Sequence, residues 1–597
     1  MENNKSFTGG DFLVRQTEAS EVFTPEEFNE EQRMIAQTCQ DFLDTEVMTV
    51  LDRIDALEPG LMREVLVKSG EMGLLGVSVP EELNGFGQSF VTSMIASEVL
   101  GAGYSYAVAW SAHTGIGSLP ILYYGNDEQR QKYSTKLATG EMIGAYCLTE
   151  PNAGSDANSG TSRVVLSEDG KHYILNGQKM WITNGGFADV FTVFAKIDND
   201  RVLSAFIVES DWEGVTLNPE EKKMGIKGSS TRQIFFNDVK VPVENLLGKR
   251  GEGFRIALNI LHVGRVKLGG NVLGSAKNGI SCSVNYANER KQFGQPISAF
   301  GAIKFKLAEQ VIRTFANESA VYRASRNIDQ ATEKYLAEGK EKYAAVVEAI
   351  AQYAIEAAIL KVYGSEALDY VVDEMVQIYG GMGFSAEAAA DRSYRDSRIN
   401  RIFEGTNEIN RMVIIDTTMK KAMRNELEIF AQANELAQNI ASIAKPDVKE
   451  LSYFDEKHLY IENWRKASVL MLGLVYNKLN KQFSTEQEIT MSVSDMIIQL
   501  YNVESVLLRV EKLAGMKSES EMVLYKDMLD VVLYDAAFIC QKSAIDALNC
   551  FMEGDELCNV HSAIKNLTWT APVNVRDARR RIADYLIDQN RYCFPTY

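Results

Sequence analysis

The chain has 597 residues, which at about 100–200 residues per domain predicts about three or four domains. Hydrophobic residues make up 46% and charged residues 24%, an ordinary globular mixture that excludes disordered, collagen-like and multi-span membrane proteins. The net charge of −19 argues against a nucleic-acid partner, because non-specific nucleic-acid binding needs a basic face.

The cysteines and the N-terminal sequence indicate the cellular compartment of the protein. Seven cysteines are spread from Cys39 to Cys593 without an evident framework, which indicates a reducing compartment. Residues 1–28 contain neither the basic nor the apolar region of a secretory signal. The longest uncharged stretch, residues 99–126, is interrupted by His113 and Pro120 and suits buried helices better than a membrane span. We expect a soluble, cytoplasmic protein.

The first part of the chain is predicted to be helical. An arm over residues 1–24 precedes a helical domain over residues 25–146, and Thr24 followed by Pro25 is typical of a helix N-cap and first turn. After Cys147 the pattern changes to short alternating or β-branched runs separated by turn signals. The runs cover residues 163–167, 173–175, 190–195, 202–208 and 233–236. Residues 147–245 are therefore predicted to form an antiparallel β domain.

Helical patterns dominate the rest of the chain. Apolar residues recur at helical spacing over residues 254–290, 299–329, 340–368 and 367–378. Long helices with short connections predict a helical bundle over residues 246–425. The polar stretch around Pro446 predicts a linker over residues 426–450, and a further helical region is expected over residues 451–597. The expected fold class is α+β, mostly α.

Several common types of site can be set aside. Cys558-x-x-His561 is a lone pair of ligand types without partners, so we expect no metal site. The glycine-rich segments at residues 251–253 and 380–383 do not follow a predicted strand, so neither is a Rossmann fingerprint.

Four separated segments carry unusual chemistry: residues 146–156, 179–185, 289–296 and 391–408. The first joins a helix to a strand, where free backbone N–H groups suit a phosphate or a polar ring edge, although a plain turn looks similar. In the second, Trp181 beside Thr183 suits stacking on a flavin, or the Trp is simply core. In the third, Arg290 either clamps a pyrophosphate or is solvated.

The fourth segment contains a candidate general base. Glu404 follows Ile402 and Phe403 and precedes Gly405, and Thr406 is a candidate N-cap of the next helix. A carboxylate at a helix break beside apolar residues is open to desolvation, which raises its pKa towards the range of a useful base.

Together these segments resemble the acyl-CoA dehydrogenases. The resemblance covers residues 25–425 and is carried by the motifs YCLTEPNAGSD, KMWITNGG, KKMGIKGSSTRQIFF, ERKQFGQPI, QIYGGMGF and YRDSRINRIFEGTNEI. The helical region after residue 445 makes the chain most similar to the very-long-chain branch. The resemblance implies an N-terminal helical domain, a middle antiparallel β-barrel domain, a C-terminal four-helix bundle and an additional C-terminal helical domain.

The resemblance also implies FAD as cofactor and a set of binding residues. Its FAD-binding positions match Tyr146, Leu148, Thr149, Gly154, Ser155, Trp181, Ile182, Thr183, Arg290, Phe293, Gln377, Gly380, Gly381, Thr406 and Glu408. Its substrate positions match Ser155, His262, Gly264, Arg265, Phe403 and Gly405. In the family the segments containing Arg290 and Gln377 reach a neighbouring subunit's cofactor, which implies an oligomer.

Glu404 matches the family's catalytic base, which removes the α-proton of an acyl-CoA thioester. Some branches place this base on an earlier helix, but that position matches Gly264, which has no side chain to serve. The implied reaction yields trans-2-enoyl-CoA in fatty-acid β-oxidation, on medium to long acyl chains, and passes electrons to electron-transferring flavoprotein. Ala109, Ala112, Gly115 and Gly117 are small residues expected near the floor of the acyl channel.

Two alternative functions and two expectations about association complete the predictions from sequence. An acyl-CoA oxidase using oxygen and a non-catalytic assembly or scaffold homologue remain open. The extension is expected to cover the face used for a second dimer contact, which predicts a homodimer. Membrane association is not expected, because the segment after the bundle, basic or apolar in the very-long-chain branch, here carries Glu428, Glu435, Asp447 and Glu450.

Overall fold

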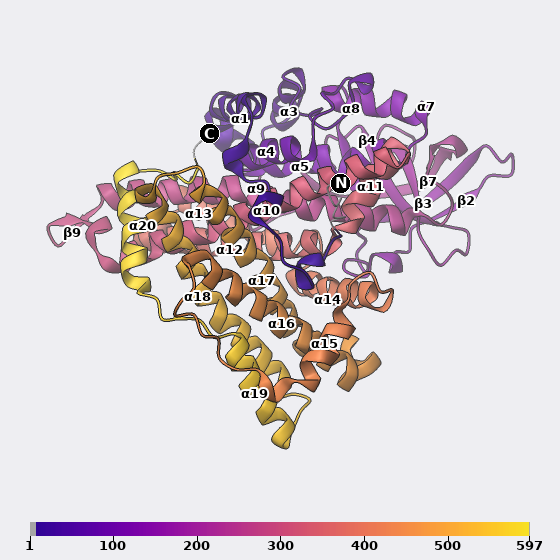
Figure 1. The fold of residues 1–597 in the computed structure, drawn as a ribbon. Helices are drawn as coiled ribbons and strands as arrows, with labels where there is room; N and C mark the ends of the chain where they lie inside the picture. The colour runs from indigo at the N-terminus through magenta and orange to yellow at the C-terminus, as the bar shows by residue number, and fades with distance from the viewer. Residues whose placement is uncertain (1–7, 596–597) are drawn as a thin grey trace.

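The computed structural model describes residues 8–595, so the first seven residues of the expected arm lie outside the described part. The N-terminal helical domain contains α1 (Glu30–Phe42), α2 (Leu51–Asp55), α3 (Leu61–Glu71), α4 (Phe90–Leu100), α5 (Ser105–Ala112), α6 (Leu119–Tyr124), α7 (Asp127–Gln129) and α8 (Thr135–Thr139) (Figure 1). Thr24 is an N-cap followed by Pro25 in the first turn, as predicted, but the element that it caps is the 3-10 turn Pro25–Glu27 and not the first α-helix. The α-helix begins after Asn29, whose side chain accepts a hydrogen bond from the Gln32 backbone N–H at 2.8 Å.

The middle domain is a sheet of eight strands. They are β1 (Gly144–Cys147), β2 (Arg163–Leu166), β3 (His172–Thr183), β4 (Val190–Ile197), β5 (Ser204–Glu209), β6 (Val215–Leu217), β7 (Thr231–Pro242) and β8 (Leu246–Leu247). The order is β6-β7-β3-β2-β4-β5-β8, and β1 pairs with β4. The expected antiparallel pairing needs a correction, because β1 and β2 both run parallel to β4. Asp189 explains the position of β1: its carboxylate accepts a hydrogen bond from the Ile143 backbone N–H at 2.7 Å and so aligns β1 with the start of β4.

The bundle carries the longest helices of the molecule. It contains α9 (Gly253–Glu289), α10 (Gly301–Ala337), α11 (Lys342–Gln352), α12 (Ala354–Tyr379), α13 (Ala389–Ser397) and α14 (Asn407–Met423). Helix α12 packs against α9, α10 and α14. The hairpin of β9 (Lys291–Gln292) and β10 (Gln295–Pro296) follows α9 and lies at one end of the molecule, far from β3 and β7 (Figure 1).

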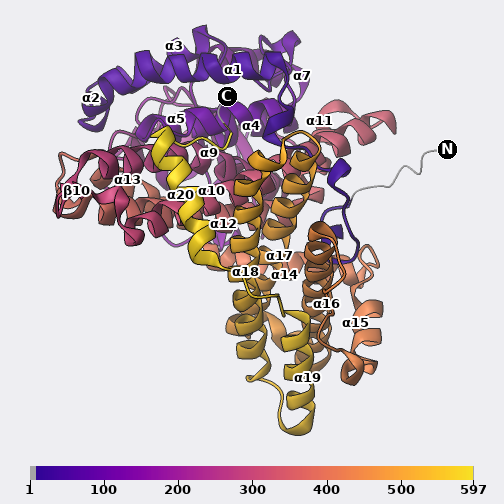
Figure 2. The same ribbon diagram turned by 60° about the vertical axis from the view of Figure 1, so that its left-hand side comes forward.

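The expected linker is partly wrong, because α15 (Ile429–Gln438) forms within it and packs against α16. The extension consists of α16 (Tyr453–Leu479), α17 (Gln487–Ala514), α18 (Glu519–Leu548), α19 (Gly554–Leu567) and α20 (Val575–Gln589). Helix α20 turns back and packs along α10 and α18 (Figure 2). Within residues 8–595 no single helix has the length and apolarity of a membrane span, and Lys342–Gln352 with Ala354–Phe384 meets the criterion only jointly, across a 61° bend.

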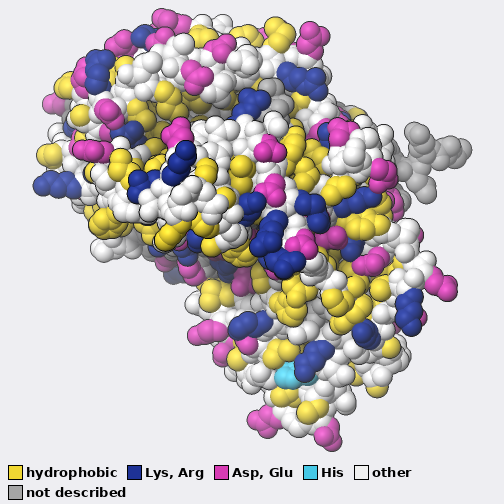
Figure 3. Space-filling view, turned by 90° about the vertical axis from the view of Figure 1, so that its left-hand side faces the viewer, with side chains coloured by type: hydrophobic (Ala, Val, Ile, Leu, Met, Phe, Trp, Pro, Cys, Tyr) yellow, Lys and Arg dark blue, Asp and Glu magenta, His cyan; other side chains and the backbone are white. Residues whose placement is uncertain are grey.

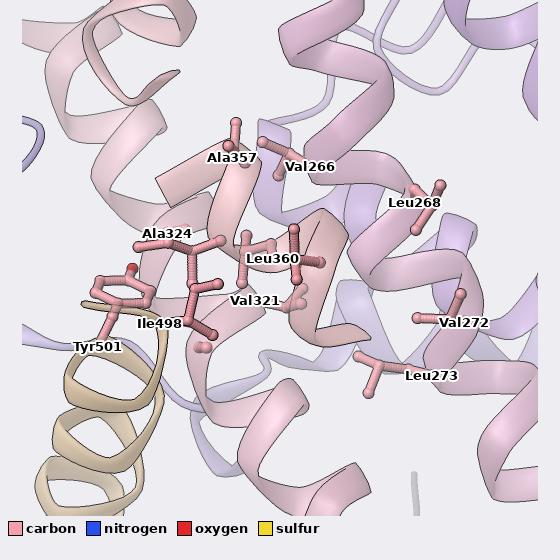
Figure 4. Close-up of a cluster of buried hydrophobic side chains, with 14 of the residues drawn as sticks. Val266, Leu268, Val272, Leu273, Val321, Ala324, Ala357, Leu360, Ile498 and Tyr501 are labelled. Atoms are coloured by element: carbon pink, nitrogen blue, oxygen red, sulfur yellow. The ribbon is translucent and has the colours of Figure 1, made fainter. Parts of the chain in front are cut away.

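The extension joins the bundle through apolar packing and buried charges. Tyr501 and Ile498 of α17 lie beside Val321 and Ala324 of α10 (Figure 4). Beside this contact, Glu504 of α17 accepts hydrogen bonds from the guanidinium groups of Arg323 and Arg465 at 2.9 and 2.6 Å. Elsewhere on the surface, acidic and basic side chains are interspersed with apolar ones (Figure 3).

Candidate functional site

Glu404 lies at a sharp break between helices. A 3-10 turn, Arg398–Arg401, ends the preceding segment, and α14 begins after Thr406, whose side chain accepts a hydrogen bond from the Ile409 backbone N–H at 3.2 Å. Glu404 itself has a positive φ of 58°. Residues other than glycine rarely adopt this backbone conformation, and those that do are frequent at functional sites. The predicted helix break and N-cap are thus confirmed.

Two side chains hold this loop by its carbonyl groups. Arg265 Nε of α9 donates a hydrogen bond to the Glu404 carbonyl oxygen at 3.1 Å. Asn410 Nδ2 donates to the carbonyl oxygens of Gly405 at 2.8 Å and Thr406 at 3.0 Å. These bonds hold the backbone from Glu404 to Thr406 in place.

Glu404 is half-buried, and one of its carboxylate oxygens is enclosed by the protein. Its Oε2 atom is buried without a hydrogen-bond partner among the described residues. It lies against Gly264 of α9, where an added Cβ would come within 2.7 Å of Oε2. Burial raises the pKa of Glu404 to about 7, although the positive charges of Arg265 and Lys361 act to lower it. A carboxyl group with this pKa is ready to accept a proton near neutral pH.

Lys361 is a nearby cation that the sequence analysis missed. Its Nζ donates a hydrogen bond to Asn407 Oδ1 at 2.6 Å, and Asn407 Nδ2 donates to Ser365 Oγ at 3.0 Å. Burial lowers the pKa of Lys361 to about 7, against the opposing effect of Glu404. A lone lysine in the apolar run of residues 357–362 is the signal that could have revealed it, because a charge seldom faces a helical core without a role.

A cavity of about 120 Å³ opens beside Glu404. One face of α9 lines it with Gly264, Lys267, Leu268, Asn271, Val272, Ser275 and Asn278. Phe403 and Thr183 lie in the same wall. Two of the four small residues expected at its floor, Ala112 and Gly115, do line it.

The other two small residues have structural roles instead, which corrects the expectation. The Ala109 carbonyl accepts a hydrogen bond from Asn184 Nδ2 at 2.9 Å. Gly117 packs against the backbone of Gly144, where an added Cβ would lie 2.7 Å from the carbonyl oxygen.

A β-bulge directs Trp181 outward. The pairing of β3 with β7 shifts register between Lys179 and Ile182, and Trp181 adopts a φ of 60°. Its side chain is 51% exposed, whereas Ile182 is buried in the core of the sheet. At the end of the bulge, Thr183 lines the cavity that contains Glu404. An exposed indole next to a hydroxyl donor at a cavity wall fits a flavin ring.

The loop after β1 provides an open surface near Trp181. The Met180 backbone N–H donates a hydrogen bond to the Thr149 carbonyl at 2.9 Å, which joins this loop to the bulge. Gly154 and Ser155 are exposed, and an added Cβ at Gly154 would meet nothing within 4 Å. The loop therefore has room for a phosphate group. Tyr146 and Leu148, by contrast, are buried beneath it.

Two polar residues sit at the margins of the site. His262 is partly buried, its Nδ1 lies 3.2 Å from an Arg265 guanidinium nitrogen, and desolvation together with the charge of Arg265 lowers its pKa to about 3. His262 is therefore neutral and cannot be a second charged group. Glu408 is exposed in the first turn of α14, and hydrogen bonding to its backbone N–H lowers its pKa.

The remaining predicted cofactor residues lie elsewhere: Arg290, Phe293, Gln377, Gly380 and Gly381 are all exposed at the far end of α9 and α12. A stack of Tyr286 on Tyr379, with centroids 4.1 Å apart, holds the two helix ends together. Arg290 is about 39 Å from Gly264 at 1.5 Å per residue along α9. One chain therefore does not bring these residues to Trp181.

Family models match most of the chain. The acyl-CoA dehydrogenase N-terminal domain matches residues 29–141, the middle domain residues 145–239 and the C-terminal domain residues 251–419. A further acyl-CoA dehydrogenase C-terminal domain matches residues 463–566, within the extension.

Comparison with individual proteins points to the same family. A probable acyl-CoA dehydrogenase of Bacillus subtilis (strain 168) is 42% identical over 591 residues, 98% of each chain. The mitochondrial very long-chain specific acyl-CoA dehydrogenase of Homo sapiens is 40% identical over 69% of this chain and 62% of its own. A crystal structure of acyl-CoA dehydrogenase complexed with FAD from Bacillus anthracis has a TM-score of 0.95 and 43% identity, and the match covers 98% of this chain and 100% of that one.

The residues near the cavity fit the cofactor of that structure: Thr183 and the unsatisfied Glu404 carboxylate line the cavity, and the outward indole of Trp181 and the open loop at Gly154 lie on the strand and loop next to Thr183. The chain belongs to the acyl-CoA dehydrogenase family, whose enzymes are FAD-dependent.

Proposed function

We propose that Glu404 is the base that removes the α-proton of an acyl-CoA thioester, so that the product is a trans-2-enoyl-CoA. The observation that carries this proposal is the buried Oε2 atom of Glu404, which lacks a partner at the wall of a cavity that Thr183 also lines. FAD, when bound by residues that include Trp181 and Thr183, supplies the two-electron acceptor of the reaction.

The surrounding residues prepare Glu404 for proton transfer. Arg265 fixes the loop through the Glu404 carbonyl, and Gly264 leaves the space that the carboxylate fills. Burial excludes water, so the carboxylate is a stronger base than it would be in solvent. The backbone N–H of Glu404 is proposed to donate to the thioester oxygen, where negative charge develops as the proton leaves.

The proposed substrates are acyl-CoA esters of medium to long chain, in fatty-acid β-oxidation, and the proposed acceptor is electron-transferring flavoprotein. Anaerobic flavin bleaching with acyl-CoAs of graded length and branching tests the substrate. An acceptor assay follows: hydrogen peroxide formed in equal amount to enoyl-CoA in air would identify an oxidase instead. If no acyl-CoA bleached the flavin, a scaffold role would replace the enzyme.

We also propose a homodimer in which the far end of α9 serves a neighbour. Arg290 and Gln377 lie too far from Trp181 to reach the same cofactor within one chain. Phe293 and Phe384 are 93% and 90% exposed at this end, and such apolar exposure suits a covered surface. Analytical ultracentrifugation should give a dimer with one FAD per chain. A stable monomer with full FAD occupancy would contradict this arrangement.

The proposed location is the cytoplasm, without membrane attachment. All seven cysteines are free thiols in the structure, including the buried Cys39, Cys147 and Cys540, which suits a reducing compartment. Fractionation of cells that produce the protein at native level, followed by detection in the supernatant or the membrane pellet, tests this location.

A further inference from the structure

Lys267 is a buried cation for which the proposed reaction has no use. It lies on α9, is 4% exposed and belongs to the wall of the cavity beside Glu404. Its ammonium group has no hydrogen-bond or ion-pair partner among the described residues. Burying an unpaired ammonium group is unfavourable, so a protein that places one in a binding cavity needs a compensating partner.

The acidic side chains of the cavity do not supply that partner. The Glu404 carboxylate lies against Gly264, under the influence of Arg265 and Lys361. Asp396 accepts a hydrogen bond from the Ile226 backbone N–H through Oδ1, while its Oδ2 is unpartnered. Burial alone lowers the pKa of Lys267, to about 8, without a contribution from either carboxylate. Among the described residues no carboxylate pairs with Lys267, so an anionic group on the ligand would be a fitting partner for it.

The position of Lys267 relative to Glu404 sets where on a ligand that partner would be. Gly264 touches the Glu404 carboxylate, which in the proposed reaction faces the α-carbon. Lys267 follows three residues later on the same face of α9, about 4.5 Å along the helix axis. It thus meets the acyl chain several carbons beyond the reacting bond, farther into the protein.

The wall beyond Lys267 is also polar. Asn271 donates from Nδ2 to Ser111 Oγ at 2.9 Å, but its Oδ1 is buried without a partner. Ser275 and Asn278 continue the same face of α9. Ser275 Oγ and Asn278 Nδ2 already donate hydrogen bonds, to the Gly101 carbonyl at 2.8 Å and to the Tyr104 hydroxyl at 3.3 Å, so Lys267 is the group of this wall that a carboxylate on the acyl chain would satisfy.

We propose that this cavity selects acyl-CoA esters whose acyl chain ends in a carboxylate, and that Lys267 is the residue that binds this carboxylate. The substrate class is the mono-CoA thioesters of dicarboxylic acids. The inference rests on the proposed function, because it places the acyl chain in the cavity beside Glu404. It goes beyond it by naming Lys267 as a specificity residue with no part in proton removal.

The test uses the FAD-loaded full-length protein and compares pairs of acyl-CoA substrates whose acyl chains have the same length. Adipoyl-CoA is paired with hexanoyl-CoA and suberoyl-CoA with octanoyl-CoA, and kcat/KM is measured for each. The wild type should prefer the carboxylated member of at least one pair by about tenfold or more, as expected for a charge-assisted pair in a buried site. Lys267→Met, which keeps the length of the side chain without its charge, should reverse that preference.

The control is Lys565→Met, which removes an exposed lysine on α19 and should leave every ratio unchanged. A wild type that favours the saturated member of both pairs would overturn the inference, whether or not Lys267→Met folds. In that case, bleaching by hexanoyl-CoA or octanoyl-CoA would leave the proposed function intact. If none of the four esters bleached the flavin, the proposed function would fail together with the inference.

Discussion

Replacing Glu404 by glutamine should abolish most of the activity and at the same time stabilise the fold above neutral pH. Glutamine keeps the size and polarity of the side chain but cannot accept the α-proton. General base catalysis contributes about 10²–10⁴-fold, so kcat should fall by at least that range. FAD content should persist, because the backbone of residue 404 is held by Arg265 and Asn410 independently of the carboxylate.

The gain in stability follows from the raised pKa of Glu404. The folded protein holds this proton up to a pH of about 7, whereas the unfolded chain releases it near 4.5, so stability falls as pH rises between these values. The difference of about 2.5 pKa units corresponds to about 3 kcal/mol at pH 8. Glutamine carries no charge and avoids this loss. For unfolding 597 residues cooperatively, about 3 kcal/mol shifts the melting temperature by about 3 °C.

The assay is a melting curve of the FAD-loaded wild type and variant between about pH 5 and pH 8.5. The two curves should nearly coincide at the acid end and separate as the pH rises. Glu408→Gln is the matched control: this carboxylate is exposed and its pKa is lowered, so its replacement should not stabilise the protein at high pH. A constant difference at all pH values, or near-normal turnover by Glu404→Gln, would refute the reasoning.

Three further predictions concern the surroundings of the base and the extension. Lys361→Met removes a cation that lowers the pKa of Glu404, so the acid limb of the kcat/KM–pH profile should move up by about one unit; an unmoved limb would exclude this coupling. Gly264→Ala places a Cβ within 2.7 Å of Glu404 Oε2 and should reduce kcat by about 10²-fold with FAD retained, as absorbance and steady-state rates would show. Arg509→Met leaves the buried Glu318 without one of its cationic partners and should lower the free energy of unfolding by about 3 kcal/mol. A melting curve should show a lower melting temperature, and an unchanged melting temperature would contradict this prediction.

Local sequence is sufficient to predict the loop that carries Glu404. Its helix break, the glycine that follows it and the Thr406 N-cap are all set by residues within a few positions of each other. The resemblance to the family then located the segments around it. The bundle and the extension could be predicted for a similar reason, since apolar residues at helical spacing report directly on which face of a helix is buried.

Features set by contacts between distant segments could not be predicted. The pairing of β1 and β2 with β4 is parallel because of where the chain enters the sheet, and alternation within a strand does not report its partner. Thr24 followed by Pro25 predicts a helix start, but this pair begins only the 3-10 turn Pro25–Glu27. Asn29 and Gln32 form a reciprocal capping box closer to the apolar run, and the structure uses it.

Lys267 and Lys361 illustrate a third limit of sequence reading. Each lies next to apolar residues in a long helix that also carries other charges, and a long cationic side chain in such a helix commonly reaches solvent along its stem. Their burial results from packing of α9 and α12 against other helices, which residue patterns along one helix do not specify. The residues that tune the site are therefore harder to find than the base itself, although they decide its pKa and the ligands it meets.

The extension is joined to α9, which lines the cavity, through one connected set of buried charges. Arg509 of α17 binds Glu318 of α10 at 2.7 Å, and Lys277 of α9 binds both Glu318 and Glu98 of α4. Each charge is acceptable in the interior because its neighbours carry the opposite sign, so none can shift without leaving another unpaired. Lys277 is next to Asn278, which lines the cavity. The extension therefore helps to fix α9 in the position where Gly264 meets Glu404, and it belongs to the same cooperative structure as the site.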